Sequence, residues 1–328
     1  MPRFAPAVLA ILAAATLVRA DEAGSALDSL VQAEKAFSAQ SVDEGMKSAF
    51  LANLADDGII FRPGPINGRS SWVARQSPPG TLIWEPAYVE VSALGDIGIS
   101  TGPWEYRPAR DSAAVAFGNF VSVWVRGEKT PWKVAVDLGV SHEKPAHGGL
   151  GAVEFRPGPE HPYHEGAPPQ PSHKSGGVSM SFGGVGFGVG TGGGGPPDDP
   201  YRRNAWEVNR MMGAERALAF ELHGKGAGRA YPKIATEDVR VYRDGAEPTI
   251  GIAEGIMQND PKPQNVEFVP FGKSVSGTWD FGYSYGLALR KGKGAARDTS
   301  GYLHVWRHTG TDEWKLSLDV ESGFPKRK

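Results

Sequence analysis

The sequence predicts an α+β fold that occurs twice in one chain of 328 residues. In each half a helical pattern precedes a series of short strand-like runs, an order typical of α+β domains. Residues 30–64 also align without a gap on residues 211–245, so that Ala33-Glu34 matches Ala214-Glu215. A second block, Trp124, Trp132, Lys133 and Asp137, recurs as Trp306, Trp314, Lys315 and Asp319 at a constant shift of 182. Self-similarity at a fixed shift indicates one fold used twice.

The helices are expected at the start of each half. Ser25 is a suitable N-cap for a helix whose apolar face carries Leu27, Leu30, Val31 and Phe37, together with Glu34. Met46, Phe50 and Leu54 indicate a second helix. After Asp56-Asp57-Gly58 the pattern predicts strands at 59–61, 82–91, 97–106, 115–125 and 132–140. Their alternation predicts an antiparallel sheet with one covered face, and the second half repeats this order.

Two further segments lie outside the repeated domains, which are predicted at 25–144 and 201–325. Residues 145–200 contain 16 Gly and 10 Pro. Such a composition cannot bury enough apolar surface to offset its ordering entropy, so we expect a disordered linker. Residues 1–20 carry Arg3, then an uncharged run from Phe4 to Val18, and are predicted to be a signal peptide cleaved after Ala20.

The leader and the composition restrict the expected location. A membrane anchor is the alternative to a signal peptide, but the 15 uncharged residues from Phe4 to Val18 are fewer than the about 20 that span a bilayer. We therefore expect an exported protein, periplasmic or secreted and bacterial, without a transmembrane segment after cleavage. The absence of cysteine excludes disulfides, cysteine zinc sites and iron-sulfur clusters.

Charge and histidine placement argue against several ligand classes. The chain has 35 Lys and Arg against 37 Asp and Glu, which argues against nucleic-acid binding. His161 and His164 lie in the predicted linker, but its many prolines and the lack of a carboxylate cluster argue against a defined zinc site. We expect neither a metal nor a cofactor.

The Ala-Glu pair of the first helix, the Asp-Asp-Gly before the first strand and the closing Trp-Lys-x3-Asp strands resemble the SnoaL-like group of the nuclear transport factor 2 superfamily. The resemblance is closest to its secreted branch of unknown function, the domain of unknown function 4440 type. It implies two cone-shaped domains, each with helices packed on a strongly curved antiparallel sheet around an apolar pocket. It also implies that the two domains can pair through their sheets as an intramolecular pseudo-dimer. The superfamily includes isomerases, cyclases, dehydratases and non-catalytic binders, so the fold does not identify an activity.

Three residues are candidates for catalysis. Asp137 and Asp319 stand where the resemblance places the acid/base aspartate of the SnoaL-type cyclases. The alternative is a polar surface position, which simple alternation along the last strand favours for Asp137. His304 shares a strand face with Tyr302 and Trp306, and is either a pocket group or a satisfied core histidine.

Arg62 and Arg243 occupy the position that carries a catalytic carboxylate in the superfamily's isomerases. A guanidinium is permanently protonated and cannot abstract a proton, which disfavours steroid-type isomerisation. The two arginines either bind an anionic ligand group or pair with Glu34 and Glu215 in the core, and we favour the ion pair.

The preferred function is binding of a small apolar or amphipathic ligand in an aromatic pocket. The expected ligand-binding residues are Arg62, Trp104, Phe120, Trp124, Arg243, Tyr283, Tyr285, Tyr302 and Trp306. One alternative is a cyclase, isomerase or dehydratase that uses Asp319 with His304, in which Asp319 titrates well above its ordinary value. Another is a structural or partner-binding envelope protein. Two G-x-S-x-G matches, at 98–102 and 282–286, lie in strand patterns that continue where a serine hydrolase needs a helix.

Overall fold

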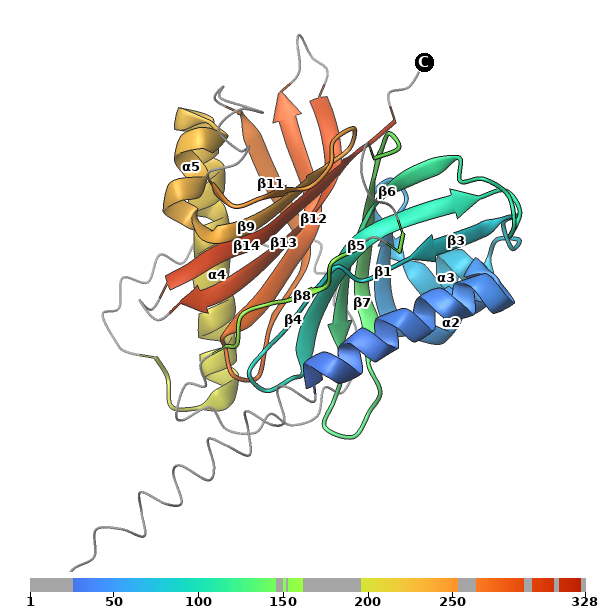
Figure 1. Cartoon of the computed structure of the whole chain (residues 1–328). Helices are drawn as coiled ribbons and strands as arrows, with labels where there is room; N and C mark the ends of the chain where they lie inside the picture. The colour runs from blue at the N-terminus through green and yellow to red at the C-terminus, as the bar shows by residue number, and fades with distance from the viewer. Residues whose placement is uncertain are drawn as a thin grey trace, which may run out of the picture.

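The computed structural model describes residues 26–145, 150–151, 153–161, 196–252, 264–291, 297–309 and 313–325. These residues form two curved sheets with helices packed against them (Figure 1). The predicted α+β class with two curved sheets is therefore confirmed. The predicted signal peptide, residues 1–20, lies outside the described residues and remains a prediction.

The first half contains a helix over residues 26–44 and ten further elements. These are α2 (Met46–Asn53), β1 (Leu54–Phe61), β2 (Pro65–Asn67), α3 (Gly68–Val73), β3 (Thr81–Trp84), β4 (Tyr88–Val91), β5 (Ile97–Arg107), β6 (Ala116–Val125), β7 (Lys133–His142) and β8 (Arg156–Pro157). The run predicted as one strand at 82–91 is two strands. Pro86 lies at the break, and it lacks the N–H that an uninterrupted ladder requires.

The second half repeats this order with fewer elements. These are α4 (Pro200–Lys225), α5 (Ala227–Ile234), β9 (Ala235–Arg243), β10 (Thr249–Ile250), β11 (Val266–Val275), β12 (Phe281–Lys291), β13 (Arg297–Thr309) and β14 (Glu313–Gly323). The long helix α4 begins at Pro200 because the Asp199 side chain accepts a hydrogen bond from the Arg202 N–H at 2.8 Å. It ends at Lys225, and the C-cap Gly226 has a φ of 72°, which suits a residue without a side chain.

The two sheets have the same strand order. The first runs β2-β1-β7-β6-β5-β4-β8 and the second runs β10-β9-β14-β13-β12-β11. The sheets are not purely antiparallel as predicted, because the last long strand of each returns beside the first in the same direction. These parallel pairs are β1 with β7 and β9 with β14, and the short edge pair of β4 with β8 is also parallel.

A one-residue bulge interrupts the closing strand of each sheet. In β7 the partners of Trp124 and Val123 are Val134 and Val136, so Ala135 is the extra residue. In β14 the extra residue is Ser317, between Leu316 and Leu318. Successive side chains of a strand point to opposite faces, so an extra residue reverses the faces of all later residues. The bulges therefore turn Asp137 and Asp319 toward the helices, and the predicted surface position of Asp137 is wrong.

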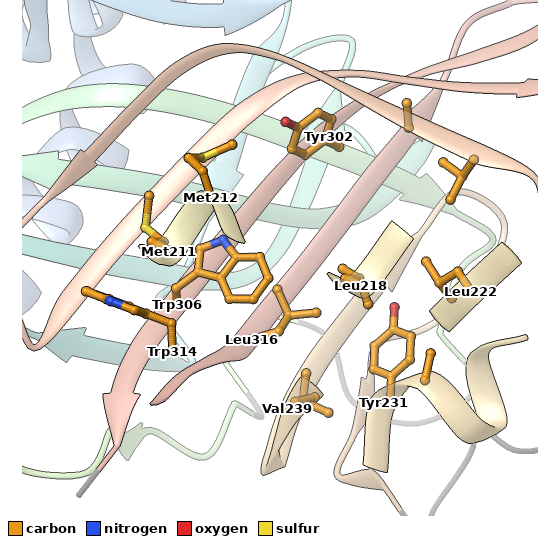
Figure 2. Packing of buried hydrophobic residues seen from close by; sticks show 14 of the residues in the cluster. Met211, Met212, Leu218, Leu222, Tyr231, Val239, Tyr302, Trp306, Trp314 and Leu316 are labelled. Carbon is orange, nitrogen blue, oxygen red and sulfur yellow. The ribbon is translucent and has the colours of Figure 1, made fainter. Parts of the chain in front are cut away.

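Three hydrophobic cores result from this arrangement. One lies between the first helices and the first sheet, and a second lies between α4, α5 and the second sheet. Figure 2 shows the second core, where Met211 and Met212 of α4 lie over Trp306 and near Trp314. The third core lies between the sheets and joins residues of both halves, such as Ile99 and Val121 with Leu303 and Val305. Both faces of each sheet thus contribute residues to a core.

Two equivalent turns connect the halves by reciprocal hydrogen bonds. The Ala93 N–H donates to Asp280 Oδ2 at 2.7 Å, and the Gly277 N–H donates to Asp96 Oδ2 at 2.8 Å. The other carboxylate oxygen of each aspartate accepts from a serine hydroxyl of its own turn, Ser92 or Ser276. Each buried aspartate therefore satisfies its own turn and the turn of the other half.

Part of the predicted linker is ordered, which corrects the prediction for residues 153–161. The Arg156 N–H donates to Ala87 O at 2.9 Å and the Gly158 N–H donates to Val89 O at 2.7 Å, so this segment adds β8 to the edge strand β4. The His161 side chain is only 3 % exposed. Backbone pairing and burial of one histidine offset the ordering cost that the composition alone suggested. Residues 162–195 lie outside the described part of the chain.

Candidate functional site

The first half contains a cavity of about 390 Å³ between its helices and the curved sheet. Its lining is mainly aromatic and aliphatic, with a few polar groups. The lining residues are Phe37, Phe50, Ile60, Phe61, Arg62, Leu82, Trp84, Trp104, Phe120, Ser122, Asp137, Gly139 and Ser141. A concave, mostly apolar cavity of this size with convergent polar groups is typical of small-molecule sites.

Asp137 is the carboxylate of this cavity. The Ser122 hydroxyl donates to its Oδ1 at 3.0 Å. Among the described residues, no Lys, Arg or His nitrogen lies within 4.0 Å of this carboxylate. Burial raises the pKa of Asp137 to about 6, while the Ser122 hydrogen bond and the positive charge of Arg62 oppose the shift. Asp137 can therefore gain or lose a proton near neutral pH.

A second carboxylate, Glu34, does not line the cavity but contacts Trp84, which does. It accepts hydrogen bonds from Trp84 Nε1 at 2.6 Å and Trp124 Nε1 at 2.8 Å. Burial raises its pKa to about 7, the two indole donors oppose this, and the negative charge of Asp137 adds to it. The predicted Arg62–Glu34 ion pair is therefore wrong, because indole N–H groups satisfy this carboxylate. The Arg62 guanidinium lies 5.2 Å from the centre of the Trp72 ring.

Both oxygens of the equivalent carboxylate of the second half, Asp319, accept hydrogen bonds from other side chains. Arg243 binds it with both nitrogens, Nη2 to Oδ2 at 2.8 Å and Nη1 to Oδ1 at 2.9 Å. The Tyr231 hydroxyl donates to the same carboxylate, and His304 Nε2 lies 3.6 Å from Oδ1. Burial alone would raise the pKa of Asp319, but Arg243 and His304 outweigh it and hold the pKa well below its ordinary value. This direction is opposite to the one expected for a catalytic Asp319.

His304 is a buried group held between two acids. Its Nδ1 lies 3.3 Å from Glu215 Oε2, and Glu215 also accepts hydrogen bonds from Tyr302 at 2.9 Å and from Ser284. Burial lowers the pKa of His304, but the carboxylates of Asp319 and Glu215 outweigh this and raise the pKa to about 9. Because Glu215 binds these groups, the predicted Arg243–Glu215 pair is also wrong.

Three residues that line this cavity are replaced by different residues at the equivalent positions of the second half. Phe50, Ser122 and Gly139 of the first half correspond to Tyr231, His304 and Glu321 of the second. All three replacements carry larger or additional polar groups into the interior. The Glu321 carboxylate binds Arg290 at 2.6 Å and 2.7 Å, whereas a Cβ on Gly139 would meet no atom closer than 3.6 Å.

The predicted site residues are thus divided among different environments. Arg62, Trp104 and Phe120 line the cavity with Asp137. Trp124, Tyr302 and Trp306 are fully buried core residues. Tyr283 and Tyr285 face the other half of the molecule.

Ser122, Gly139, Phe37 and Phe50 also line the cavity but were not predicted as site residues. The signal that could have found three of them is the comparison of the two copies, in which Ser122, Gly139 and Phe50 differ from their polar counterparts. The two G-x-S-x-G serines, Ser100 and Ser284, lie within β5 and β12 and precede no helix.

Within the described ranges, no group of three or more His, Asp or Glu side chains is placed to hold a metal ion. Within the same ranges, no helix combines the length and the apolar character that crossing a bilayer requires.

No family model and no curated protein matches the chain. Similar solved structures include an NTF2-like protein of unknown function from Pseudomonas putida KT2440, with a TM-score of 0.32, 10% identity, and coverage of 38% of this chain and 91% of that one. A ketosteroid isomerase-like protein from Erwinia carotovora atroseptica SCRI1043 has a TM-score of 0.29 and 15% identity, and the match covers 37% of this chain and 98% of that one. An LEH-like epoxide hydrolase from M. tuberculosis has a TM-score of 0.27 and 12% identity, and the match covers 36% of this chain and 81% of that one. Because these TM-scores lie below 0.5, the similarities carry no conclusion about function.

Proposed function

We propose that the cavity of the first half binds one small amphipathic molecule, and that the second half is a structural counterpart. The observation that carries this proposal is the difference between Asp137 and Asp319. Asp137 faces an aromatic cavity with a hydroxyl as its hydrogen-bond partner, whereas Asp319 is bound by Arg243, Tyr231 and His304. Buried polar groups are normally satisfied, so a ligand group is the natural additional partner of Asp137.

The lining defines the chemical class of the ligand. Trp84, Trp104 and Phe120 provide an apolar surface for a ring or a short hydrocarbon body. Asp137 can accept a hydrogen bond from a hydroxyl when ionised and donate one to a carbonyl when protonated. Arg62 adds a positive charge to the lining. The ligand is therefore a compact apolar molecule with a hydroxyl or carbonyl group at one end.

Filling the cavity tests this proposal. Gly139→Leu places a side chain in the cavity, and titration with the dye 1-anilinonaphthalene-8-sulfonate measures what remains of binding. Gly224→Leu is the matched control, because no atom lies within 4 Å of a Cβ at that helical position. We expect Gly139→Leu to weaken dye binding at least tenfold and Gly224→Leu to leave it unchanged. Equal dye binding by both variants and the native chain would contradict the proposal.

A second candidate is an enzyme of the cyclase, isomerase or dehydratase kind, in which Asp137 transfers a proton. A carboxyl with a pKa of about 6 is suited to general acid–base work near neutral pH. Native mass spectrometry before and after denaturation would show whether a small molecule co-purifies. A released carbonyl compound should then gain deuterium in D₂O with the native chain and not with Asp137→Asn. If the compound binds but exchanges no deuterium, the enzyme hypothesis fails and the ligand-binding function stands.

We also propose that the protein is exported, on the strength of its first twenty residues. Intact mass measurement of the chain purified from its native host should give a polypeptide that begins at Asp21. If neither a ligand nor the dye binds, a structural or partner-binding role in the cell envelope is favoured instead.

A further inference from the structure

A second hollow, of about 720 Å³, lies between the two halves. The first half contributes the start of β1, the start of β7 and the turn at 126–131. The second half contributes β11 and β12, with Phe271, Lys273, Tyr283 and Tyr285 among the lining residues. We call this hollow the cleft. It shares no lining residue with the cavity that contains Asp137.

The cleft lies along a strand edge whose equivalent in the first half is occupied. Residues 272–275 of β11 correspond to β4, because Val275 pairs with Gly282 as Val91 pairs with Gly98. The outer edge of β4 carries β8, held by the carbonyls of Ala87 and Val89. The equivalent carbonyls of β11 belong to Phe271 and Lys273. Among the described residues, no strand pairs with this edge of β11.

Differences in side chains keep the cleft open. On the β8 side, Arg307 donates to Glu90 at 2.9 Å and to Asp238 at 2.7 Å, and His161 Nε2 lies 2.7 Å from Glu90. In the cleft the residue equivalent to Arg307 is Val125, and the residue equivalent to Glu90 is Ser274. The ion cluster that fills one side of the interface has no equivalent on the other.

We propose that the cleft binds an extended, acidic segment of another protein, which adds to the edge of β11 at 272–275 as β8 adds to β4. An unpaired strand edge offers backbone donors and acceptors that an extended peptide matches and a compact small molecule does not. The chain's own use of the equivalent edge shows that a short, proline-containing segment can pair with it.

The charges and rings of the cleft define the class of segment. Its lining includes four cationic residues, Arg69, Arg126, Lys133 and Lys273, against two acids, Asp56 and Asp57. Phe271 is 49 % exposed, and Tyr283 and Tyr285 line the wall beside it. Acidic side chains complement the cations, and an apolar or aromatic side chain can pack against these rings.

The test uses a nine-residue peptide with the sequence of residues 153–161, altered by Arg156→Glu and His161→Ala. The first change adds an acid, and the second removes the histidine that favours β4. We expect this peptide, labelled for fluorescence anisotropy, to bind the full chain. Hydrogen exchange should slow at 271–275 and remain unchanged at 87–91, because only the free edge gains a partner strand.

Two charge-reversal variants distinguish specific binding in the cleft from general electrostatic attraction to the protein surface. Lys273→Glu should weaken peptide binding at least fivefold. Lys35→Glu, an equal charge change on the first helix outside the cleft lining, should leave binding unchanged. The proposal is overturned if the peptide does not bind at millimolar concentration, if it binds without protecting 271–275, or if both variants weaken binding equally. None of these results bears on the dye-binding cavity, because Gly139→Leu tests that site separately.

Discussion

The same aspartate has opposite acid–base properties in the two halves. Asp137 and Asp319 occupy equivalent positions after equivalent bulges, and Asp319 is buried whereas Asp137 is partly buried. Burial raises the pKa of Asp137 to about 6. The Ser122 hydroxyl, its hydrogen-bond partner, is neutral and offsets only part of this rise. Arg243 and His304 lower the pKa of Asp319 even though this carboxylate is the more deeply buried of the two. The neighbouring side chains, and not the position in the fold, determine which carboxyl can exchange a proton.

At the residue scale, Asp137→Asn should stabilise the protein at neutral pH. The folded-state pKa of about 6 lies above the ordinary value of 3.8, so ionising this carboxyl costs stability as the pH rises from about 4 to about 6. The two-unit difference corresponds to at most about 3 kcal/mol. Urea unfolding should therefore show Asp137→Asn more stable than the native chain at pH 7 and nearly equal at pH 4.

The control for this prediction is Asp43→Asn, which removes an exposed carboxylate paired with Arg110 at 3.0 Å. An exposed pair contributes little, so its pH dependence should follow that of the native chain. A loss of stability at pH 7 in Asp137→Asn would show that the ionised carboxylate has a stabilising partner, contrary to the structure.

Glu34 provides a spectroscopic test of the same principle. Its folded-state pKa of about 7 is above the ordinary 4.5, and its partners are the indole N–H groups of Trp84 and Trp124. Ionisation of Glu34 changes the field at both rings, so tryptophan emission should titrate with a midpoint near pH 7. Glu34→Gln should remove this transition. An unchanged transition in the variant would assign it to another group, such as a histidine.

At the scale of elements, the sequence predicts the order of helices and strands but not the faces of the closing strands. The alternation of Trp132, Val134 and Val136 correctly indicates a strand. It cannot reveal that Ala135 is a bulge, because a bulge depends on the register with β6 and not on the residue itself. The sequence therefore pointed to Asp137 but not to Gly139 as a site residue. It could not show that both residues face the cavity.

Composition was similarly limited as a guide to the linker. Glycine and proline correctly separate the two repeated segments, yet residues 153–161 pack as β8 and a buried His161. The partners that order this segment, Glu90 and Asp280, are distant in the sequence and come from both halves. No local property of residues 153–161 reports such contacts.

This element should be sensitive to pH. His161 faces Glu90, Asp280, Arg307 and the ring of Phe281. Burial lowers its pKa, but the acids outweigh burial and raise the pKa above 6.5. The protonated histidine therefore stabilises the segment below pH 6.5, and this contribution is lost as the pH rises through the raised value. Cleavage by the Glu-specific protease Glu-C after Glu154, relative to an unstructured reference peptide, should accelerate on alkalinisation.

His161→Ala should make that cleavage fast at every pH, because Glu90 and Asp280 lose their imidazole partner. His223→Ala is the control, since His223 is an exposed residue near the end of α4. Cleavage that remains slow in His161→Ala would show that the β8 backbone bonds alone hold the segment.

At the scale of the whole molecule, the two halves share structure that neither has alone. The third core lies between their sheets, and the turns of Asp96 and Asp280 exchange hydrogen bonds. Apolar burial of this kind is the main favourable contribution to folding. We therefore expect the described halves to unfold together, in one calorimetric transition, and not as two independent domains.

Arg307 tests this cooperativity directly. Its side chain is 10 % exposed and belongs to the second half, but it binds Glu90 and Tyr88 of the first as well as Asp238. Arg307→Met would leave Glu90 buried with one cationic partner fewer, and breaking a buried ion pair costs about 3–5 kcal/mol. If the halves are coupled, the single transition shifts as a whole to lower temperature.

Arg110→Met is the matched control, because its partner Asp43 is exposed and such pairs contribute at most about 1 kcal/mol. Two transitions in the native chain would refute the coupling outright. A shift confined to one of two transitions in Arg307→Met would place the stabilising role of the arginine within its own half. A single shifted transition means that Glu90, Arg307 and the shared core act as one cooperative unit.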